Sequence, residues 1–254
     1  MRRILKQIFY GIFYLAVFGG IAAGIYFGFL RPAPSCADGK LNQQEEEIDC
    51  GGAYCEDCAL RKLKPITALP VQFFGADTAT TIFLQLQNPN LNYGAERLDF
   101  DIKFFDRAGN NFKTLSDSTF IYPGEIRALV FPAQAIEFTR VARAEFVGRN
   151  FVWKKAADFA RPAADAREVR TRLEGEGVVV DGVIQNGNLY GLSRVTISAI
   201  IANKQGFFVN ASKTFVADLG PREERFFKIF LPVDGAERGN IDPARTRVYL
   251  EVIR

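Results

Sequence analysis

Four cysteines, the only ones in the chain, lie within 23 residues near the N-terminus. They are Cys36, Cys50, Cys55 and Cys58, with the spacing C-x13-C-x4-C-x2-C. Such a cluster can form disulfides, bind zinc as thiolates or act as a redox pair. We favour two disulfides, because Cys36 and Cys50 are too far apart for a zinc-ribbon half-site and the C-x2-C pair follows an acidic loop. All three possible pairings stay open.

Four side chains with oxygen atoms lie between these cysteines: Asp38, Asn42, Glu45 and Asp49. Because Ca²⁺ takes about six to eight oxygen ligands in proteins, they form a candidate calcium site. Their spacing differs from that of an EF-hand loop. The alternative is that these groups cap turns in a small cross-linked segment without a core of its own. No other cofactor is expected.

An uncharged stretch of 23 residues, Ile8 to Leu30, precedes the cysteines. As a helix it would be about 35 Å long, enough to cross the bilayer core. Arg2, Arg3 and Lys6 come before it, so the positive-inside rule places the N-terminus in the cytoplasm and everything after Arg31 outside. We expect an uncleaved single-pass anchor in the cell membrane, because the stretch exceeds the length of about 7–15 residues usual for a signal peptide.

The composition argues against several classes of function. Hydrophobic residues make up 48% of the chain and charged residues 24%, and histidine is absent. Without histidine the chain lacks the usual general base near neutral pH, so we expect no enzymatic activity. The net charge of +3 comes from the basic N-terminal tip, and the nearly neutral remainder disfavours a nucleic-acid partner. Asp99 and Asp101 alternate with large apolar residues, as on the wet face of an antiparallel sheet.

Two parts of the chain repeat each other at an interval of 97 or 98 residues. The aligned residues are Gln87, Asn88, Asn90, Leu91, Gly109 and Pro123 in the first copy and Gln185, Asn186, Asn188, Leu189, Gly206 and Pro221 in the second. Alternating strings such as "LDFDIKFF" and turn signals such as "RAGNN" are typical of antiparallel strands. The fold class that we predict is mainly β: a single N-terminal transmembrane helix followed by two tandem Ig-like antiparallel β-sandwiches.

The predicted organisation has five parts. They are a cytoplasmic tip and transmembrane helix (1–31), a disulfide-stapled cysteine-rich segment (32–64), a first sandwich (65–153), a linker (154–174) and a second sandwich (175–254). The string "KKAADFARPAADAREVRTRLE" is rich in alanine and charge, and we interpret it as a linker that runs into the first strand of the second sandwich.

The cysteine-rich segment resembles a short motif of bacterial surface and exported proteins, which reads DG…N…E…DCGG…C…C. The matching residues are Asp38, Gly39, Asn42, Glu45, Asp49, Cys50, Gly51, Gly52, Cys55 and Cys58. This resemblance implies an exported setting.

The repeated part resembles the FxLYD family of extracytoplasmic β-sandwich modules. In the second copy the residues that carry the likeness are Gly182, Asn186, Leu219, Pro221, Glu223 and Phe226, and the first copy keeps the central strand in "FDIKFFDRAGNNF". The resemblance implies a β-sandwich fold and an envelope setting, with no catalytic residues.

Together these features predict a membrane-anchored cell-envelope protein of a non-enzymatic, binding or structural type. Its expected partners are the lipid bilayer and an envelope protein or a wall polymer. The alternative is an accessory or sensor subunit of a membrane complex, in which the helix face with Gly20 and Gly24 contacts a neighbouring helix. An exposed apolar patch on either sandwich would favour the first function.

Overall fold

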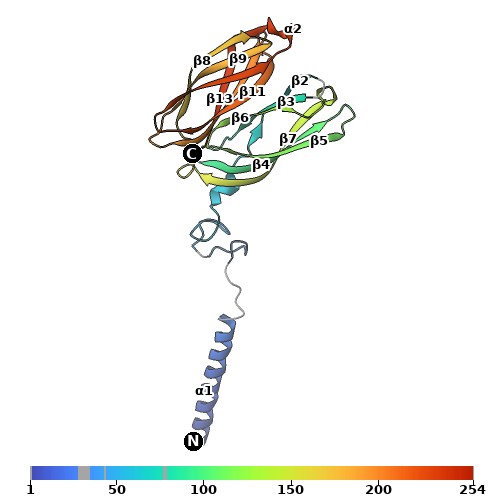
Figure 1. The fold of residues 1–254 in the computed structure, drawn as a ribbon. Helices are drawn as coiled ribbons and strands as arrows, with labels where there is room; N and C mark the ends of the chain where they lie inside the picture. Colours follow the sequence, from blue (N-terminus) through green and yellow to red (C-terminus); the bar gives the residue numbers. More distant parts are fainter. Residues whose placement is uncertain (1, 28–34, 43, 77–78, 254) are drawn as a thin grey trace. The chain divides into compact units, whose positions relative to one another are not determined.

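The structure is a computed structural model that describes residues 2–27, 35–42, 44–76 and 79–253 (Figure 1). The chain forms two compact units, Met1–Leu63 and Lys64–Arg254. The first unit contains helix α1 (Arg2–Ile25) and the cysteine-rich segment, which ends in the short 3-10 helix η2 (Cys58–Lys62). The second unit contains strands β1 to β13.

Helix α1 is the apolar helix that the sequence predicts. Its stretch Lys6–Ile25 has a mean hydropathy of 2.0, and its side chains are exposed along the whole length. By length and composition this helix can cross a membrane, although a signal sequence has the same properties. The end of the predicted span, residues 28–30, and the following Arg31 lie outside the described residues.

The first sandwich consists of two antiparallel sheets whose inner faces meet. In one sheet β3 is central, with β6 along one edge and the short strands β1 and β2 along the other; in the second, β4 lies between β5 and β7. Leu98, Phe100 and Ile102 of β4 are buried between the sheets, as the alternating pattern predicts. The elements are β1 (Thr67–Ala68), β2 (Gln72–Ala76), β3 (Ala79–Gln87), β4 (Tyr93–Phe105), β5 (Asn111–Ile121), β6 (Ile126–Gln134), η3 (Phe138–Arg140) and β7 (Arg143–Lys155).

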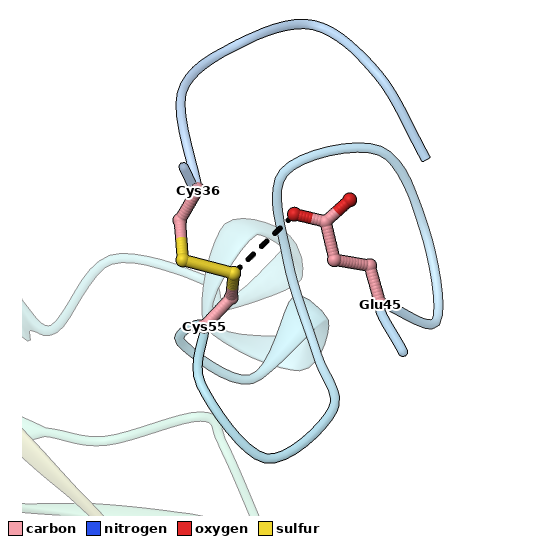
Figure 2. Close-up of side chains that lie close together, drawn as sticks. All are labelled: Cys36, Glu45 and Cys55. Atoms are coloured by element: carbon pink, nitrogen blue, oxygen red, sulfur yellow. Dashed lines mark hydrogen bonds between the residues drawn. A yellow bond between two sulfur atoms is a disulfide. The ribbon is translucent and has the colours of Figure 1, made fainter. Parts of the chain in front are cut away.

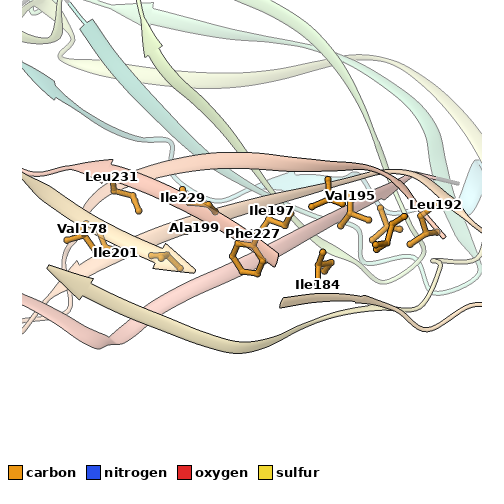
Figure 3. Close-up of a cluster of buried hydrophobic side chains, with 14 of the residues drawn as sticks. Val178, Ile184, Leu192, Val195, Ile197, Ala199, Ile201, Phe227, Ile229 and Leu231 are labelled. Atoms are coloured by element: carbon orange, nitrogen blue, oxygen red, sulfur yellow. The ribbon is translucent and has the colours of Figure 1, made fainter. Parts of the chain in front are cut away.

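The second sandwich is built in the same way. Strand β9 lies between β8 and β12 in one sheet, and β10 lies between β11 and β13 in the other. Figure 3 shows its core, where valine, leucine and isoleucine side chains from β9, β10 and β12 surround Phe227. The elements are β8 (Ala164–Glu174), β9 (Gly177–Asn186), β10 (Leu192–Asn203), β11 (Phe208–Leu219), β12 (Glu224–Pro232), α2 (Gly235–Arg238) and β13 (Ile241–Ile253).

The two sandwiches share one strand order, which is the structural counterpart of the sequence repeat. In each, the first, second and fifth strands form one sheet and the third, fourth and sixth form the other, if β1 and β2 are counted as one interrupted strand. The chain is therefore mainly β, with two antiparallel β-sandwiches behind one apolar helix. Their Ig-like classification stays a prediction.

The predicted linker is too long. Strand β7 ends at Lys155 and β8 begins at Ala164, so residues 156–163 join the sandwiches and 164–174 belong to the second one. Ala164 and Ala166 pack against the core, whereas the charged residues beside them point outward. An edge strand whose inward side chains are small and whose outward side chains are charged has the same composition as a linker. For this reason the sequence of residues 164–174 wrongly predicts a linker.

A buried asparagine holds the loops at one end of the second sandwich. The side-chain amide of Asn186 donates to the carbonyl oxygens of Tyr190 and Gly220, both at 2.8 Å. Its side-chain oxygen accepts from the backbone N–H of Asn188 at 2.9 Å. The side chain therefore satisfies backbone groups from two different loops that would otherwise lack partners.

The first sandwich repeats this network. Asn88 donates to the carbonyl oxygens of Tyr93 (2.8 Å) and Tyr122 (3.0 Å). The second asparagine of each motif exchanges two hydrogen bonds with the backbone of the segment that leads into the first strand. These pairs are Asn90 with Lys64 and Asn188 with Ala163. The repeated asparagines thus hold the loops and the entry segment at one end of each sandwich in place by hydrogen bonds.

Replacing Asn186 with alanine should lower the free energy of unfolding by about 2–4 kcal/mol, because buried carbonyl oxygens lose their donor. Urea denaturation of the full-length protein measures this change. The control is Asn111→Ala on β5, where the exposed amide contacts only Thr114 among the described residues and the expected loss is below about 0.5 kcal/mol. Equal losses of unfolding free energy in Asn186→Ala and Asn111→Ala would show that Asn186 does not hold the loops of the second sandwich.

Candidate functional site

The four cysteines form two disulfides, Cys36–Cys55 and Cys50–Cys58. Their loops overlap in the sequence, with separations of 19 and 8 residues. In the chain-entropy account each cross-link stabilises the folded segment by about 2–3 kcal/mol. Since none of the four cysteines is free, this pairing leaves no thiolate for zinc or for a redox pair.

An acidic side chain lies against each disulfide. Figure 2 shows the carboxylate of Glu45 beside the Cys36–Cys55 bond, with Oε1 at 3.3 Å from Cys55 Sγ. Glu47 lies near the Cys50–Cys58 bond in the same way. A disulfide sulfur carries no proton and is not a thiolate, so neither group has the chemistry of a metal centre. Glu47 instead pairs with Lys62 at 2.6 Å, and this hydrogen bond lowers the pKa of Glu47.

The four predicted calcium ligands share one hydrogen-bonded loop. Asp49 Oδ1 accepts from the backbone N–H groups of Asp38 (2.9 Å) and Gly39 (3.0 Å). Asp38 Oδ2 accepts from the side chain of Asn42 at 2.9 Å, which lowers the pKa of Asp38. Glu45 Oε2 accepts from the backbone N–H of Asn42 at 3.1 Å. N–H donors thus occupy oxygens of Asp38, Glu45 and Asp49, which matches the turn-capping alternative, whereas Asn42 Oδ1 is buried without a hydrogen-bond partner among the described residues. Calcium binding stays a prediction.

The backbone of this loop explains the Gly-Gly pair in the motif. Gly52 has a φ of 73°, and a Cβ at this position would lie 2.3 Å from the carbonyl oxygen of Gln44. Any side chain there would both strain the backbone and push the two loop segments apart. The motif is therefore a structural requirement of the cross-linked segment.

The two sandwiches meet in an apolar junction. Phe83, Ala128 and Val130 of the first sandwich contact Ile200 and Ala211 of the second. The outer face of the sheet with β3 and β6 thus covers the outer face of the sheet with β10 and β11. The half-buried residues Phe74, Phe208 and Tyr249 surround this contact. Burial of these side chains from water favours one fixed arrangement of the sandwiches.

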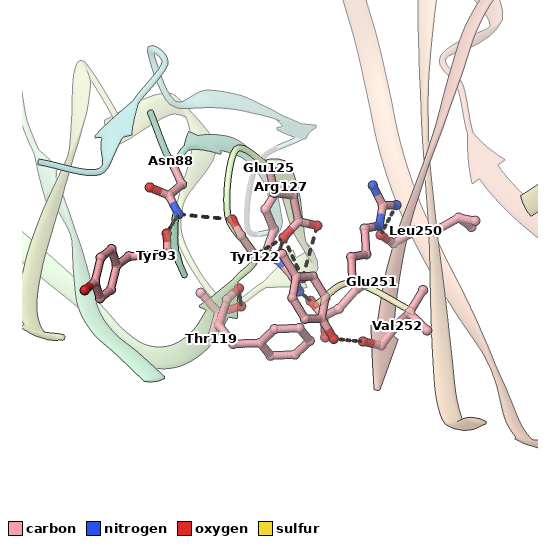
Figure 4. Close-up of polar contacts among 11 residues, drawn as sticks. Asn88, Tyr93, Thr119, Tyr122, Glu125, Arg127, Leu250, Glu251 and Val252 are labelled. Atoms are coloured by element: carbon pink, nitrogen blue, oxygen red, sulfur yellow. Dashed lines mark hydrogen bonds and ion pairs between the residues drawn. The ribbon is translucent and has the colours of Figure 1, made fainter. Parts of the chain in front are cut away.

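A buried ion-pair network crosses the junction (Figure 4). The guanidinium of Arg127, whose side chain is 1% exposed, lies 3.0 Å from a carboxylate oxygen of Glu125 and 3.0 Å from one of Glu251. It also covers the ring of Phe120, 3.8 Å from the ring centroid. A buried guanidinium without its carboxylates is strongly destabilising. Arg127 therefore links the first sandwich to β13 of the second.

Sequence reasoning missed this network, although part of its signal is present. The pairs Glu125–Arg127 and Glu223–Arg225 lie 98 residues apart. In the second sandwich the side chain of Arg225 is 40% exposed and pairs only with Glu223 among carboxylates of the described chain. The repeat identifies the ion pair, but the burial of Arg127 depends on β13 of the other sandwich. That contact has no local signature in the sequence.

Tyr122 adds a second polar contact across the junction. Its hydroxyl donates to the carbonyl oxygen of Val252 at 3.0 Å, and its side chain is buried. Burial disfavours the charged phenolate and raises the pKa of Tyr122 to about 12.

This shift predicts a loss of stability at high pH. The folded pKa of Tyr122 lies above the ordinary value of 10.0, so its contribution is fully present below pH 10 and is lost as the pH rises through about 12. The expected loss is at most about 2–3 kcal/mol. Urea denaturation between these pH values measures it, and Tyr122→Phe should remove this part of the pH dependence. If Tyr122→Phe keeps the pH dependence of the wild type, the prediction is wrong. The control is Tyr54→Phe, at an exposed tyrosine, which should keep the pH dependence of the wild type.

Two clefts lie beside this junction and share the segment Ser118–Phe120 of β5. One has a volume of about 230 Å³ and lies between β5 and β6 of the first sandwich and β11 and β13 of the second. The other, shallower and about 510 Å³, is bordered by Glu96, Arg97 and Val152. We call the two together the junction groove. Residues of both sandwiches line its inner cleft, and residues of the first sandwich line its outer cleft.

Asp99 and Asp101 lie on the outward face of β4, as the sequence predicts. Asp99 accepts from Arg97 at 2.8 Å, and this hydrogen bond lowers the pKa of Asp99. Asp101 accepts from the hydroxyl of Ser116 at 2.6 Å and faces Arg149 at 3.4 Å. Each carboxylate is thus held by its own donors on a sheet surface.

Comparisons with known proteins find no related family. No protein-family model and no curated protein sequence matches the chain. Among solved structures, a red sea bream transglutaminase is similar at 11% sequence identity and a TM-score of 0.23. The match covers 77% of this chain and 32% of the transglutaminase chain. A structural likeness this low carries no argument about fold or function.

Proposed function

We propose that this protein is a single-pass, membrane-anchored component of the cell envelope that presents two β-sandwiches outside the cytoplasm for binding. The observation that carries this proposal is the pairing of all four cysteines in disulfides that follow the apolar helix in the sequence. Disulfides persist in oxidising compartments and are rare in the cytosol. The three basic residues before the helix favour a cytoplasmic N-terminus, which agrees with exported disulfides.

A binding or structural role suits the second unit better than catalysis. The chain contains no histidine, and the repeated polar residues serve as loop-fixing groups. Two phenylalanines on the outer face of β12, Phe226 and Phe230, are 61% and 50% exposed. Exposed aromatic side chains on one sheet face support contact with a partner. Membership of the FxLYD family and of the bacterial surface motif belongs to the same proposal.

The alternative proposal is an accessory or sensor subunit of a membrane complex. It is supported by the open helix face at Gly20 and Gly24, where an added Cβ would meet no atom of the described chain within 4 Å. Small residues allow a second helix to approach closely. Photo-crosslinking from this face distinguishes the two proposals, because only the alternative requires one specific helix neighbour.

Reporter fusions to the full-length protein test the orientation. Alkaline phosphatase at the C-terminus should be active and green fluorescent protein there should be dark, because the first works only outside the cytoplasm and the second is expected to fluoresce only inside. The membrane-bound product should also keep the mass of the N-terminal segment. Replacing Arg2, Arg3 and Lys6 with glutamate should reduce the phosphatase signal, whereas the same change at Lys113, Arg143 and Arg149 of the first sandwich should not. A fluorescent C-terminal fusion would refute the proposal.

A further inference from the structure

The inner cleft of the junction groove exists only because the two sandwiches dock, whereas the outer cleft belongs to the first sandwich alone. The inner cleft takes its walls from β5 and β6 of one sandwich and from β11 and β13 of the other. The apolar junction and the Arg127 network fix these four strands relative to each other. Binding pockets form preferentially at such interfaces, and a preformed wall loses little entropy when a ligand binds. The inner cleft therefore has walls that are fixed before any ligand binds.

The floor of the inner cleft is aromatic and aliphatic. In the described chain β5 pairs only with β4 and β6 only with β3, so the side of the first sandwich between these edges is open. Core residues Phe100 and Leu129 line the cleft at this opening, together with the half-buried rings of Phe120 and Phe131. Flat apolar rings of this kind pack well against the C–H face of a sugar ring.

The rim of the cleft carries hydrogen-bonding groups of both signs. Asp117 sits opposite Phe100 at an inward-facing position of β5, and in the described chain its carboxylate accepts only from the adjacent Ser118 N–H, at 2.8 Å. Lys213 forms no ion pair with a described residue, and its ammonium lies 5.5 Å from the centroid of the Phe131 ring. The hydroxyl-bearing residues Ser118 and Thr119 complete the rim. One carboxylate and one ammonium are thus available to a ligand.

Charge and desolvation decide which ligand class fits. The lining carries charges of both signs: Glu251 pairs with Arg127 and Glu96 with Lys154, so Asp117 and Lys213 are the lining charges of the inner cleft without an ion-pair partner among the described residues. An anionic polymer would be repelled by Asp117 as it approached Lys213. A purely apolar ligand would bury Asp117 and Lys213 without partners, which costs free energy. A hydroxyl-rich neutral ligand avoids both penalties, because its hydroxyls donate to the carboxylate and accept from the ammonium.

We propose that the junction groove binds a segment of a neutral oligosaccharide. The ring of Phe131 packs against a sugar face, Asp117 accepts hydroxyl donors, and Lys213 donates to hydroxyl or ring oxygens. The adjoining outer cleft along Ser118–Phe120 gives room for a neighbouring sugar. This inference rests on the proposed function, because it names the ligand class that the exported sandwiches would meet in the envelope.

Binding of labelled full-length protein in detergent to an array of neutral and anionic oligosaccharides tests the inference. The expected result is retention on neutral oligosaccharides, and isothermal titration calorimetry with the retained sugar then gives the affinity. Asp117→Asn and Lys213→Met should each weaken binding roughly tenfold or more, because each removes a hydrogen bond to a charged group.

Two matched variants serve as controls. Asp165→Asn, on the outer face of β8, and Lys113→Met, an exposed residue of β5 that does not line the groove, should leave the affinity unchanged. All four positions are exposed, and thermal unfolding checks that the variants fold.

Absence of retention on every neutral oligosaccharide overturns the inference, as does retention that Asp117→Asn and Lys213→Met do not weaken. Binding of a peptide array that is lost in Asp117→Asn would overturn the ligand class. Because the reporter fusions measure orientation alone, correct orientation without sugar binding rejects this inference and leaves the proposed function intact.

Discussion

The contact between the two sandwiches is the constraint on which the rest of the second unit depends. Phe83 and Ile200 exclude water at its centre, and beside them the buried guanidinium of Arg127 needs carboxylates from both sandwiches. Apolar burial supplies most of the attraction, while the ion pairs select one relative orientation, since a shifted arrangement would leave a buried charge unpaired. The inner cleft of the junction groove and the environment of Tyr122 are both consequences of this docking.

The internal repeat also shows how the two sandwiches differ on the sheet faces that lie outside the junction. The equivalent of Phe83 in the second sandwich is Asp181, and the equivalent of Ile200 in the first is Lys103. Both lie on sheet faces that do not take part in the junction, and Asp181 is paired with Arg172 at 2.5 Å. Each of these faces thus carries a charged residue at the position where the junction has a large apolar side chain, and the buried Asp181 is neutralised by its partner Arg172. The two copies therefore differ at the junction face while both have the loop-fixing asparagines.

The sequence was informative where local patterns decide the structure. Alternation along β4 predicts which side chains are buried, and the repeat predicts two sandwiches with one strand order. The cysteine spacing favours disulfides but does not choose among pairings, because the choice depends on how the Gly52 turn brings segments together. The linker was overestimated because β8 is an exposed edge strand. The groove and the burial of Arg127 were out of reach, since both depend on contacts between residues more than a hundred positions apart.

Differential scanning calorimetry of the full-length protein tests most directly whether the two sandwiches form one structural unit. In the wild type the two sandwiches should unfold together in a single cooperative transition. In Phe83→Asp they should unfold in two separate transitions, because this change puts a charged side chain into the junction; aspartate is the residue at the equivalent position of the second copy, Asp181. Phe226→Asp, on the exposed face of β12, should keep the single transition. Two independent transitions in the wild type, unaffected by Phe83→Asp, would show that the two sandwiches do not form one structural unit.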